Sequence, residues 1–313
     1  MIVAFLDLLG FSALLETDVE VALDNMNSFN NALRTKVIDN KNHPISEYDS
    51  EIQAFAEKSS VTSFEQMISF SDSLILGGSN VDLFVSQLAN FVASAYITYA
   101  KPFREKFADI KQVTTDQIVT ATGNGSFRKH RAFPVLFRGG ISSGDNVGFF
   151  DEYHIKDSSM EFKSRNVTGL TYLNAVRLEH SGKGPRLFCD QSVVDTLSSK
   201  KMIKEVDKER GIFEIVWSIE GCETLVCSSN KWDNVIRSIT ETMLPPAVNL
   251  YLYYRMNNSL KEQYGELLKL VCCGIVKYAE NECSRGKDAM TLINKKLEEI
   301  PLLDSSVFNG FLE

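Results

Sequence analysis

The stretch that decides the fold is MIVAFLDLLGFS, residues 1–12. Ile2–Leu8 is a short apolar run, which is typical of a buried strand, and Gly10 and Ser12 indicate a turn and a helix start. Asp7 lies inside this run. A buried carboxylate is costly unless a metal ion or a basic group pairs with it, so either Asp7 has such a partner or the strand is misassigned.

Working outward from residue 12, apolar residues at helical spacing predict helices over 13–37, 80–107 and 169–180. Short apolar runs predict two strands over 66–76 that meet at residues 71–73, a strand over 133–141 with its return over 144–150, and strands over 185–189 and 212–217. Residues 39–63 are expected to be a polar insertion, and residues 109–131 a loop-rich stretch. The order of elements predicts an α/β sandwich with helices over one mixed sheet.

After about residue 232 strand signals are sparse, and helical patterns cover 260–280 and 289–299. Pro245 and Pro246 are expected to interrupt the approach to these helices. We therefore predict one α/β domain over 1–235 and a helical extension over 236–313. The apolar stripe in this extension is either core packing or a surface for a partner; it comprises Leu260, Tyr264, Leu267, Leu268 and Val271.

Composition sets further bounds on the class of protein. The net charge of −8 argues against a protein that coats nucleic acid, although it leaves room for a small basic pocket for phosphates. The 6 cysteines form no CxxC pair and no zinc-type spacing, which favours reduced thiols in a cytoplasmic protein. No signal peptide and no run of 18 apolar residues is found, so no membrane association is expected.

Two carboxylates fall at the ends of predicted strands, Asp7 in the first strand and Asp72 at the turn within 66–76. On neighbouring strands they could share two divalent cations, as in phosphoryl-transfer sites. The alternative for Asp72 is an ordinary turn residue, because Asp and Ser are common in turns.

Four strings in the sequence resemble, in family order, the motifs of class III nucleotide cyclases. They are FLDLLGFS (5–12), SFSDSL (69–74), FRGGISSG (137–144) and GLTYLNAVRLE (169–179). In the family the second of these usually contains Gly-Asp. The resemblance covers about residues 1–190 and implies the ferredoxin-like fold of these enzymes, with a mixed or antiparallel sheet covered by helices.

The resemblance implies a role for each matching residue. Asp7 and Asp72 would hold two divalent cations, Mn²⁺ or Mg²⁺, with the Leu8 carbonyl as a further ligand. The phosphates would be cradled by the backbone N–H groups of Leu9, Gly10, Phe11 and Ser12. Arg138 would contact the triphosphate. Arg177 would come from the other subunit of a head-to-tail homodimer and stabilise the transition state.

The sequence departs from the family at the positions that read a purine base. Ile68 stands where purine-using members have lysine or glutamate, and Asn166 stands where they have aspartate or cysteine. Leu173 replaces the asparagine that holds the ribose, and Asn174 is displaced from it by one residue, about 100° around a helix. Tyr172 is a further candidate for contact with ribose or base.

Because the metal and phosphate positions persist while the purine readers do not, the sequence most resembles the pyrimidine cyclases of bacterial Pycsar antiphage systems. That resemblance implies conversion of CTP or UTP to cyclic CMP or cyclic UMP, a second messenger that acts on a separate effector protein. The alternatives are an adenylate or guanylate cyclase with an unusual base pocket and a catalytically silent nucleotide-binding sensor. The sequence does not identify which residue distinguishes CTP from UTP.

Overall fold

In the computed structural model, the described residues are all except 39–49, 105–116, 122–126, 157–159, 227–231 and 301–313. Within them a seven-stranded sheet has the order β10-β11-β9-β6-β1-β3-β2. Every neighbouring pair is antiparallel except β6 and β9. The strands are β1 Ile2–Leu8, β2 Gln66–Phe70, β3 Ser73–Gly78, β6 Phe137–Ser143, β9 Leu187–Asp190, β10 Ile203–Asp207 and β11 Ile212–Ile215. The predicted α/β class is therefore confirmed, with a mostly antiparallel sheet.

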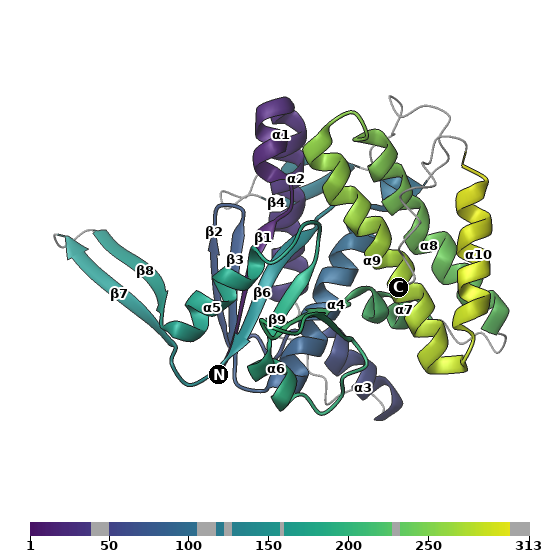
Figure 1. Cartoon of the computed structure of the whole chain (residues 1–313). Coiled ribbons are helices and arrows are strands. Elements are labelled where there is room, and N and C mark those ends of the chain that lie inside the picture. The colour runs from purple at the N-terminus through teal and green to yellow at the C-terminus, as the bar shows by residue number, and fades with distance from the viewer. Residues whose placement is uncertain (39–49, 105–116, 122–126, 157–159, 227–231, 301–313) are drawn as a thin grey trace.

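The helices lie on both faces of this sheet (Figure 1). They are α1 Phe11–Thr17, α2 Val19–Ala32, α3 Ser50–Ser59, α4 Val81–Tyr99, α5 Leu170–Glu179, α6 Gln191–Thr196, α7 Ser218–Leu225, α8 Trp232–Tyr253, α9 Asn258–Cys283 and α10 Gly286–Glu298. Two short helical turns, η1 Leu33–Ile38 and η4 Lys101–Arg104, follow α2 and α4. Side-chain oxygens of Asp18, Asn80 and Asn257 cap the N-termini of α2, α4 and α9, which explains where these helices begin.

The alternation of β1 separates two cores. Ile2, Ala4, Leu6 and Leu8 are buried in the main core together with residues of α4, α8 and α9. Val3 instead packs in a smaller cluster with Ala175 of α5, and Phe5 borders that cluster. Because successive side chains of a strand point to opposite faces, Asp7 shares the face of Val3 and Phe5. The sheet thus directs Asp7 toward the α5 side and away from the main core.

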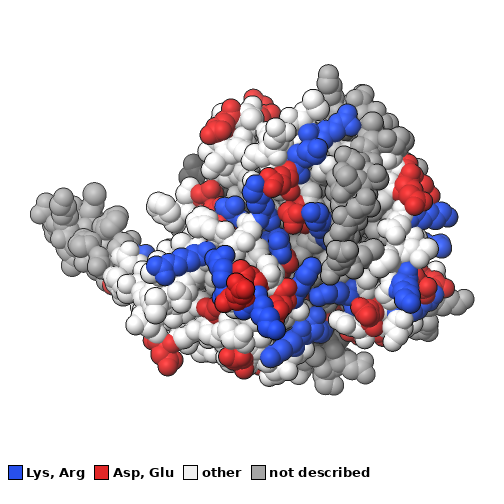
Figure 2. Space-filling view, in the orientation of Figure 1, with Lys and Arg blue, Asp and Glu red and all other residues white. Residues whose placement is uncertain are grey.

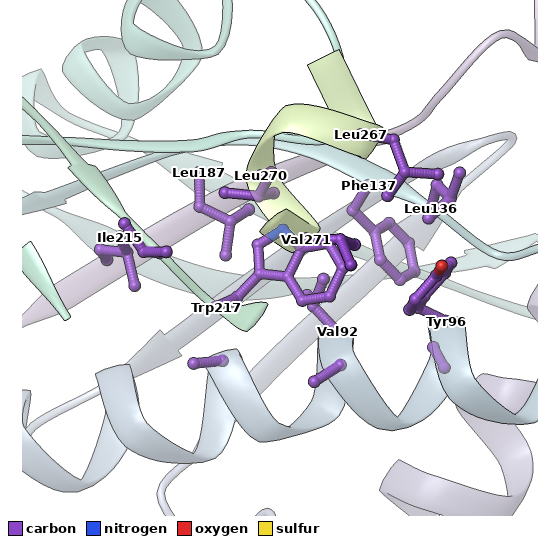
Figure 3. Packing of buried hydrophobic residues seen from close by; sticks show 14 of the residues in the cluster. Val92, Tyr96, Leu136, Phe137, Leu187, Ile215, Trp217, Leu267, Leu270 and Val271 are labelled. Carbon is purple, nitrogen blue, oxygen red and sulfur yellow. The ribbon is translucent and has the colours of Figure 1, made fainter. Parts of the chain in front are cut away.

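Trp217 lies at the centre of the main core, between the sheet and two helices (Figure 3). Its ring meets Tyr96 of α4 edge-on, with ring centroids 5.7 Å apart. Its indole Nε1–H donates to the carbonyl of Pro185 at 2.7 Å, which satisfies the one polar atom of this fully buried side chain. Leu267, Leu270 and Val271 of α9 complete the surroundings.

The C-terminal helices are part of this core, because one continuous hydrophobic cluster includes β1 together with α8, α9 and α10. The stripe Leu260, Tyr264, Leu267, Leu268 and Val271 is buried, which confirms the core reading. The prediction that Pro245 and Pro246 interrupt the chain is wrong: both lie inside α8. The domain boundary at residue 235 stays a prediction.

Other corrections concern pairing that local patterns do not reveal. The stretch predicted as loop-rich contains the hairpin of β4 Gln117–Ala121 and β5 Phe127–Arg131. The residues predicted to return along β6 instead begin β7 Gly148–Lys156, which pairs with β8 Met160–Thr168. This β7–β8 arm projects from the body of the molecule (Figure 1). The predicted polar insertion includes α3, and β10 was not predicted.

One helix among the described residues, α4, is long and apolar enough to cross a membrane by length and composition. It is mostly buried, with 72% of its most apolar window inside the protein, as expected of a core helix. On the face shown in Figure 2, acidic and basic side chains are interspersed.

Candidate functional site

The register of the sheet brings three of the predicted site residues together. Asp7 of β1 is paired with Ser73 of β3 on one side and with Arg138 of β6 on the other. Asp72 immediately precedes Ser73, and its carbonyl accepts a hydrogen bond of 2.9 Å from the Leu8 N–H. Ser73 and Arg138, which are 66 and 131 residues away from Asp7 in sequence, thus lie beside it at the end of β1.

The β2–β3 turn that carries Asp72 has an unusual backbone. Phe70 and Ser73 are paired, so Ser71 and Asp72 form a two-residue loop. Ser71 has φ of 53°, in the left-handed region that favours glycine. Ser71 stands where the motif that this turn resembles usually has glycine, the residue that this conformation favours.

Asp7 has an electrostatic environment that is rich in negative charge. Burial raises the pKa of its carboxyl to about 6, and the neighbouring carboxylates of Asp72 and Glu179 act in the same direction. Arg138, whose Nη2 lies 3.6 Å from Asp7 Oδ2, and the Ser73 hydroxyl, which donates to Asp7 Oδ1 at 3.4 Å, offset only part of this effect. A positive charge placed beside Asp7 would relieve the repulsion between these carboxylates.

Arg138 is held from the other side by Glu179, the last residue of α5. Its Nε donates to Glu179 Oε1, and the Glu179 carboxylate, although 1% exposed, also lies 2.8 Å from Nδ1 of the exposed His180. Arg138 thus bridges Asp7 and Glu179. Sequence reasoning gave Glu179 no role in the site; its place at the end of the GLTYLNAVRLE motif was the only available signal.

Glu179 reaches Arg138 because α5 lies directly on β6. A Cβ added at Gly140 would lie 2.0 Å from the Ala175 carbonyl oxygen and 2.6 Å from the Glu179 backbone nitrogen. The second glycine of FRGGISSG is therefore required by the contact between helix and sheet.

The turn after β1 is the predicted phosphate cradle. Gly10 has φ of 76° and precedes the first residue of α1, Phe11. The first N–H groups of a helix have no partner within it, so Phe11 and Ser12 fit the predicted role. Leu9 does not: its N–H donates to the Leu136 carbonyl at 2.8 Å. That prediction needs correction, because the Leu9 donor is already committed to β-type pairing.

The candidate base-contact residues come from three different elements, β2, β8 and α5. Ile68 pairs with Ile75, and Ile75 pairs with Phe5, so these side chains form the row next to that of Asp7. Ile68 and Tyr172 both border the smaller apolar cluster. Asn166 pairs with Phe150 near the base of the β7–β8 arm and is partly buried. The structure therefore places Ile68 and Tyr172 against the same apolar cluster.

Arg177 is not brought to the carboxylates within one chain. It lies on the exposed face of α5 together with Leu170 and Leu173, which are 54% and 41% exposed. Asn174 is partly buried beside them. No ion pair joins Arg177 to an acidic residue in the part of the chain that the structure describes.

The donor set at Asp7 fits a magnesium-type or manganese-type ion. Across the described ranges, no group of three or more His, Cys, Asp or Glu side chains is arranged to hold a metal. Two carboxylates and the Leu8 carbonyl are hard oxygen donors. Mg²⁺ is commonly held by only one or two carboxylates, with substrate phosphates completing its coordination.

Comparison with models of known protein families and with curated protein sequences gives no match. The family resemblance therefore depends on the four motifs and on the positions that the fold gives their residues.

Proposed function

We propose that this protein is a metal-dependent nucleotide cyclase that converts CTP or UTP to the 3′,5′-cyclic monophosphate and pyrophosphate. The observation that carries the proposal is the convergence of Asp7, Asp72 and Arg138 where β1 ends, beside the Gly10 turn. Four motifs far apart in sequence contribute to this one region. Two carboxylates, a guanidinium and a helix start are the groups that triphosphate chemistry requires.

The reaction is an in-line displacement within one substrate molecule. The ribose 3′-hydroxyl loses its proton to solvent, and its oxygen forms a bond to the α-phosphorus. The bond from the α-phosphorus to the bridging oxygen breaks, and pyrophosphate leaves with that electron pair. Two divalent cations held by Asp7, Asp72 and the Leu8 carbonyl would lower the pKa of the 3′-hydroxyl and neutralise charge on the phosphates. Arg138 would hold the triphosphate, and the N–H groups of Phe11 and Ser12 would donate to its oxygens.

The base preference is supported by the row that contains Ile68. Ile68, Ile75 and Phe5 are apolar and offer no hydrogen bond to a purine edge. Tyr172, a predicted contact that carries a polar group, borders the same cluster. A small pyrimidine stacked in this apolar setting is consistent with the loss of both purine readers.

The finer fold assignment is also part of the proposal. The order β6-β1-β3-β2, with helices between β1 and β2 and between β3 and β6, follows the β-α-β-β-α-β pattern of ferredoxin-like folds. The strands β9, β10 and β11 extend this sheet at the β6 side. This arrangement supports the class III cyclase fold implied by the motifs.

A head-to-tail homodimer would supply Arg177 to the site of each subunit from the other subunit. Arg177 is exposed on α5 rather than directed at Asp7 of its own chain. Exposed apolar side chains occur on the elements around the site, namely Phe70 of β2, Phe150 of β7 and Leu170 and Leu173 of α5. These side chains would be covered if a second copy packed on this face, and in the head-to-tail arrangement implied by the motifs that copy would bring its Arg177 to this site.

The resemblance to Pycsar cyclases supports a role as producer of a second messenger for a separate effector in antiphage defence. A cytoplasmic location agrees with this role. The cysteines among the described residues are free, and the long apolar helix α4 is a core helix.

The test is to incubate the purified protein with Mn²⁺ and, separately, ATP, GTP, CTP and UTP, and to identify products by mass spectrometry. We expect a cyclic pyrimidine monophosphate and pyrophosphate, with no product from the Asp7→Ala and Asp72→Ala variants. A cyclic purine product would overturn the proposed base preference. Metal-dependent nucleotide binding without pyrophosphate release would indicate the silent sensor instead.

A further inference from the structure

The Gly10 turn is in contact with a residue about 250 positions away in sequence. A Cβ at Gly10 would lie 3.0 Å from Leu260 Cδ2 and 3.5 Å from Gln263 Oε1, both on α9. Leu260 is fully buried. The turn that would cradle the phosphates is thus packed against the first turns of a C-terminal helix.

The same face of α9 contacts a second loop, the one that follows α5. A Cβ at Gly184 would lie 2.3 Å from Glu266 Cβ and 3.2 Å from the Gln263 carbonyl oxygen. Arg186 Nη1 lies 3.8 Å from Glu266 Oε2, and Lys183 Nζ lies 2.7 Å from Glu262 Oε2. Residues 260–266 of α9 therefore join the Gly10 turn to the loop that continues from the Glu179 end of α5.

The beginning of α9 is itself firmly placed. The Asn257 side chain caps the helix by accepting from the Leu260 N–H at 3.1 Å. Tyr264 stacks on Tyr254 of the turn between α8 and α9, with ring centroids 5.1 Å apart. Downstream, Leu267 and Leu270 are buried in the main core around Trp217 (Figure 3). Because the start of α9 is fixed in this way, the Leu260 side chain can restrict the conformation of the Gly10 turn. Glycine has no Cβ, so its backbone can otherwise adopt more conformations than that of other residues.

We propose that Leu260 of α9 is a positioning residue that holds the Gly10 turn in the conformation that binds the triphosphate. That the turn binds a triphosphate rests on the proposed function. That Leu260 restrains the turn rests on the contact between Leu260 and Gly10. It assigns the C-terminal helices to the nucleotide site, where sequence analysis predicted a separate extension. Any movement of α9 would then change phosphate affinity without altering a group that touches the substrate.

The test compares Leu260→Ala with Leu270→Ala in the full chain. Both are buried leucines of α9, but Leu270 lies ten residues further along, about 15 Å at 1.5 Å per residue. It packs near Trp217 (Figure 3). The first readout is amide hydrogen exchange of residues 9–14, which includes the Leu14 N–H bonded to the Gly10 carbonyl at 2.9 Å. The second is binding of inorganic triphosphate in the presence of Mn²⁺, measured by calorimetry.

We expect Leu260→Ala to raise exchange in residues 9–14 by about tenfold over Leu270→Ala, and to weaken triphosphate binding by a similar factor. Equal exchange in the two variants would overturn the inference whatever the protein binds. If the wild-type protein binds no triphosphate, the proposed function fails, and the positioning role in phosphate binding fails with it. In that case, higher exchange of residues 9–14 in Leu260→Ala would still show that Leu260 restrains the Gly10 turn, so the two failures can be told apart.

Because Leu→Ala changes in a core can prevent folding, the pair Leu260→Val and Leu270→Val provides a milder comparison. Valine at position 260 removes the Cδ2 atom that contacts the turn and keeps the rest of the helix face. The same ordering of exchange and affinity is expected, with smaller differences. Full wild-type exchange and affinity in Leu260→Val, beside a folded Leu270→Val control, would also overturn the inference.

Discussion

Asp7 is held where its charge is unfavourable in the metal-free protein. Strand alternation directs it to the α5 side of the sheet, and register pairs it with Ser73 and Arg138. Its neighbours Asp72 and Glu179 add negative charge that Arg138 only partly offsets. Perturbed carboxylates of this kind cluster at functional sites, and the proposed function gives Asp7 the role of a cation ligand.

The raised pKa of Asp7 gives a prediction for Asp7→Asn. With a folded pKa of about 6 against an ordinary 3.8, the folded state binds more protons than the unfolded state between these values. Stability from this group is therefore present below about pH 4 and is lost as the pH rises through 6. At pH 7.5 without metal, Asp7→Asn should raise the free energy of unfolding by about 1 kcal/mol, after allowance for partial exposure.

Urea denaturation in EDTA at pH 7.5 and pH 4 measures this difference, which should vanish at the lower pH. Asp145→Asn is a suitable control, because Asp145 is exposed. Mn²⁺ should stabilise the wild-type protein and not Asp7→Asn. A variant that is less stable than the wild type at pH 7.5 would show that the Arg138 contact outweighs burial and repulsion.

Glu179 gives a second prediction at this scale. It is almost fully buried and is paired with Arg138, so Glu179→Ala leaves a partly buried guanidinium with only the longer Asp7 contact. Breaking a buried pair in this way is strongly destabilising, and we expect a loss of about 3 kcal/mol in chemical denaturation. His180→Ala removes the other partner of Glu179. Because His180 is exposed, this variant should lose less than about 1 kcal/mol in the free energy of unfolding. Similar losses in both variants would contradict this assignment.

At the scale of elements, the position of α5 depends on Gly140. A methyl group there would meet the backbone of α5 at Ala175 and Glu179, and backbone atoms cannot move aside as a flexible side chain can. Gly140→Ala should cost about 3 kcal/mol, the upper range for overpacking, and should displace the helix that carries Arg177 and Glu179.

The matched control for this substitution is Gly148→Ala, because the nearest atom to a Cβ at Gly148 is Thr168 Cγ2 at 3.9 Å. It should change stability by less than about 0.5 kcal/mol. Urea midpoints of the two variants give the comparison, and near-ultraviolet circular dichroism reports whether the packing of α5 is retained. Equal midpoints would mean that α5 can shift away from β6 without cost.

Elements with a strong local signal were predictable from the sequence. The apolar run of β1, the paired runs of β2 and β3, and the helical spacing of α5 placed Asp7, Asp72 and Arg177 on the correct kinds of element. β10 was not predicted, because the alternation of IKEVD is weak and mostly polar. The pairing of β7 with β8 was not predicted either, since a local hairpin with β6 fits the same residues equally well.

The helix α8 shows why local rules fail in a large core. Two prolines remove backbone donors and normally end a helix, yet α8 continues through Pro245 and Pro246. Tertiary contacts support this segment: Tyr96 Oη donates to the Met243 carbonyl at 2.6 Å, and the Asn249 side chain donates to the Phe103 carbonyl. Burial of the surrounding residues then outweighs the tendency of proline to end a helix. These tertiary contacts could not be predicted from the sequence of α8 alone.

At the scale of the whole molecule, the site is assembled from distant parts of the chain. The carboxylates come from the N-terminal strands, Arg138 from β6, and the packing behind Gly10 from α9. Contacts such as Gly10–Leu260 depend on how helices and sheet stack, so they leave no signal in a single sequence. Arg177 remains outside this assembly on an exposed face, which is why the proposed function includes a second subunit.

The head-to-tail dimer can be tested by mixing two inactive chains. If each site takes Asp7 from one subunit and Arg177 from the other, a heterodimer of Asp7→Ala and Arg177→Ala contains one intact site and one doubly defective site. With random pairing, half of the dimers are heterodimers with one working site of two. Co-expressed chains should therefore recover about a quarter of wild-type cyclase activity, although each variant alone is inactive.

The matched control is a mixture of Asp7→Ala and Asp72→Ala, measured by the same product assay. Register and hydrogen bonding place both aspartates in one subunit, so every site in that heterodimer lacks one of them and no activity should return. Recovery in the first mixture alone would place Arg177 in the partner's site. Recovery in neither mixture would contradict a shared site, and recovery in both would mean that the two aspartates act from different subunits.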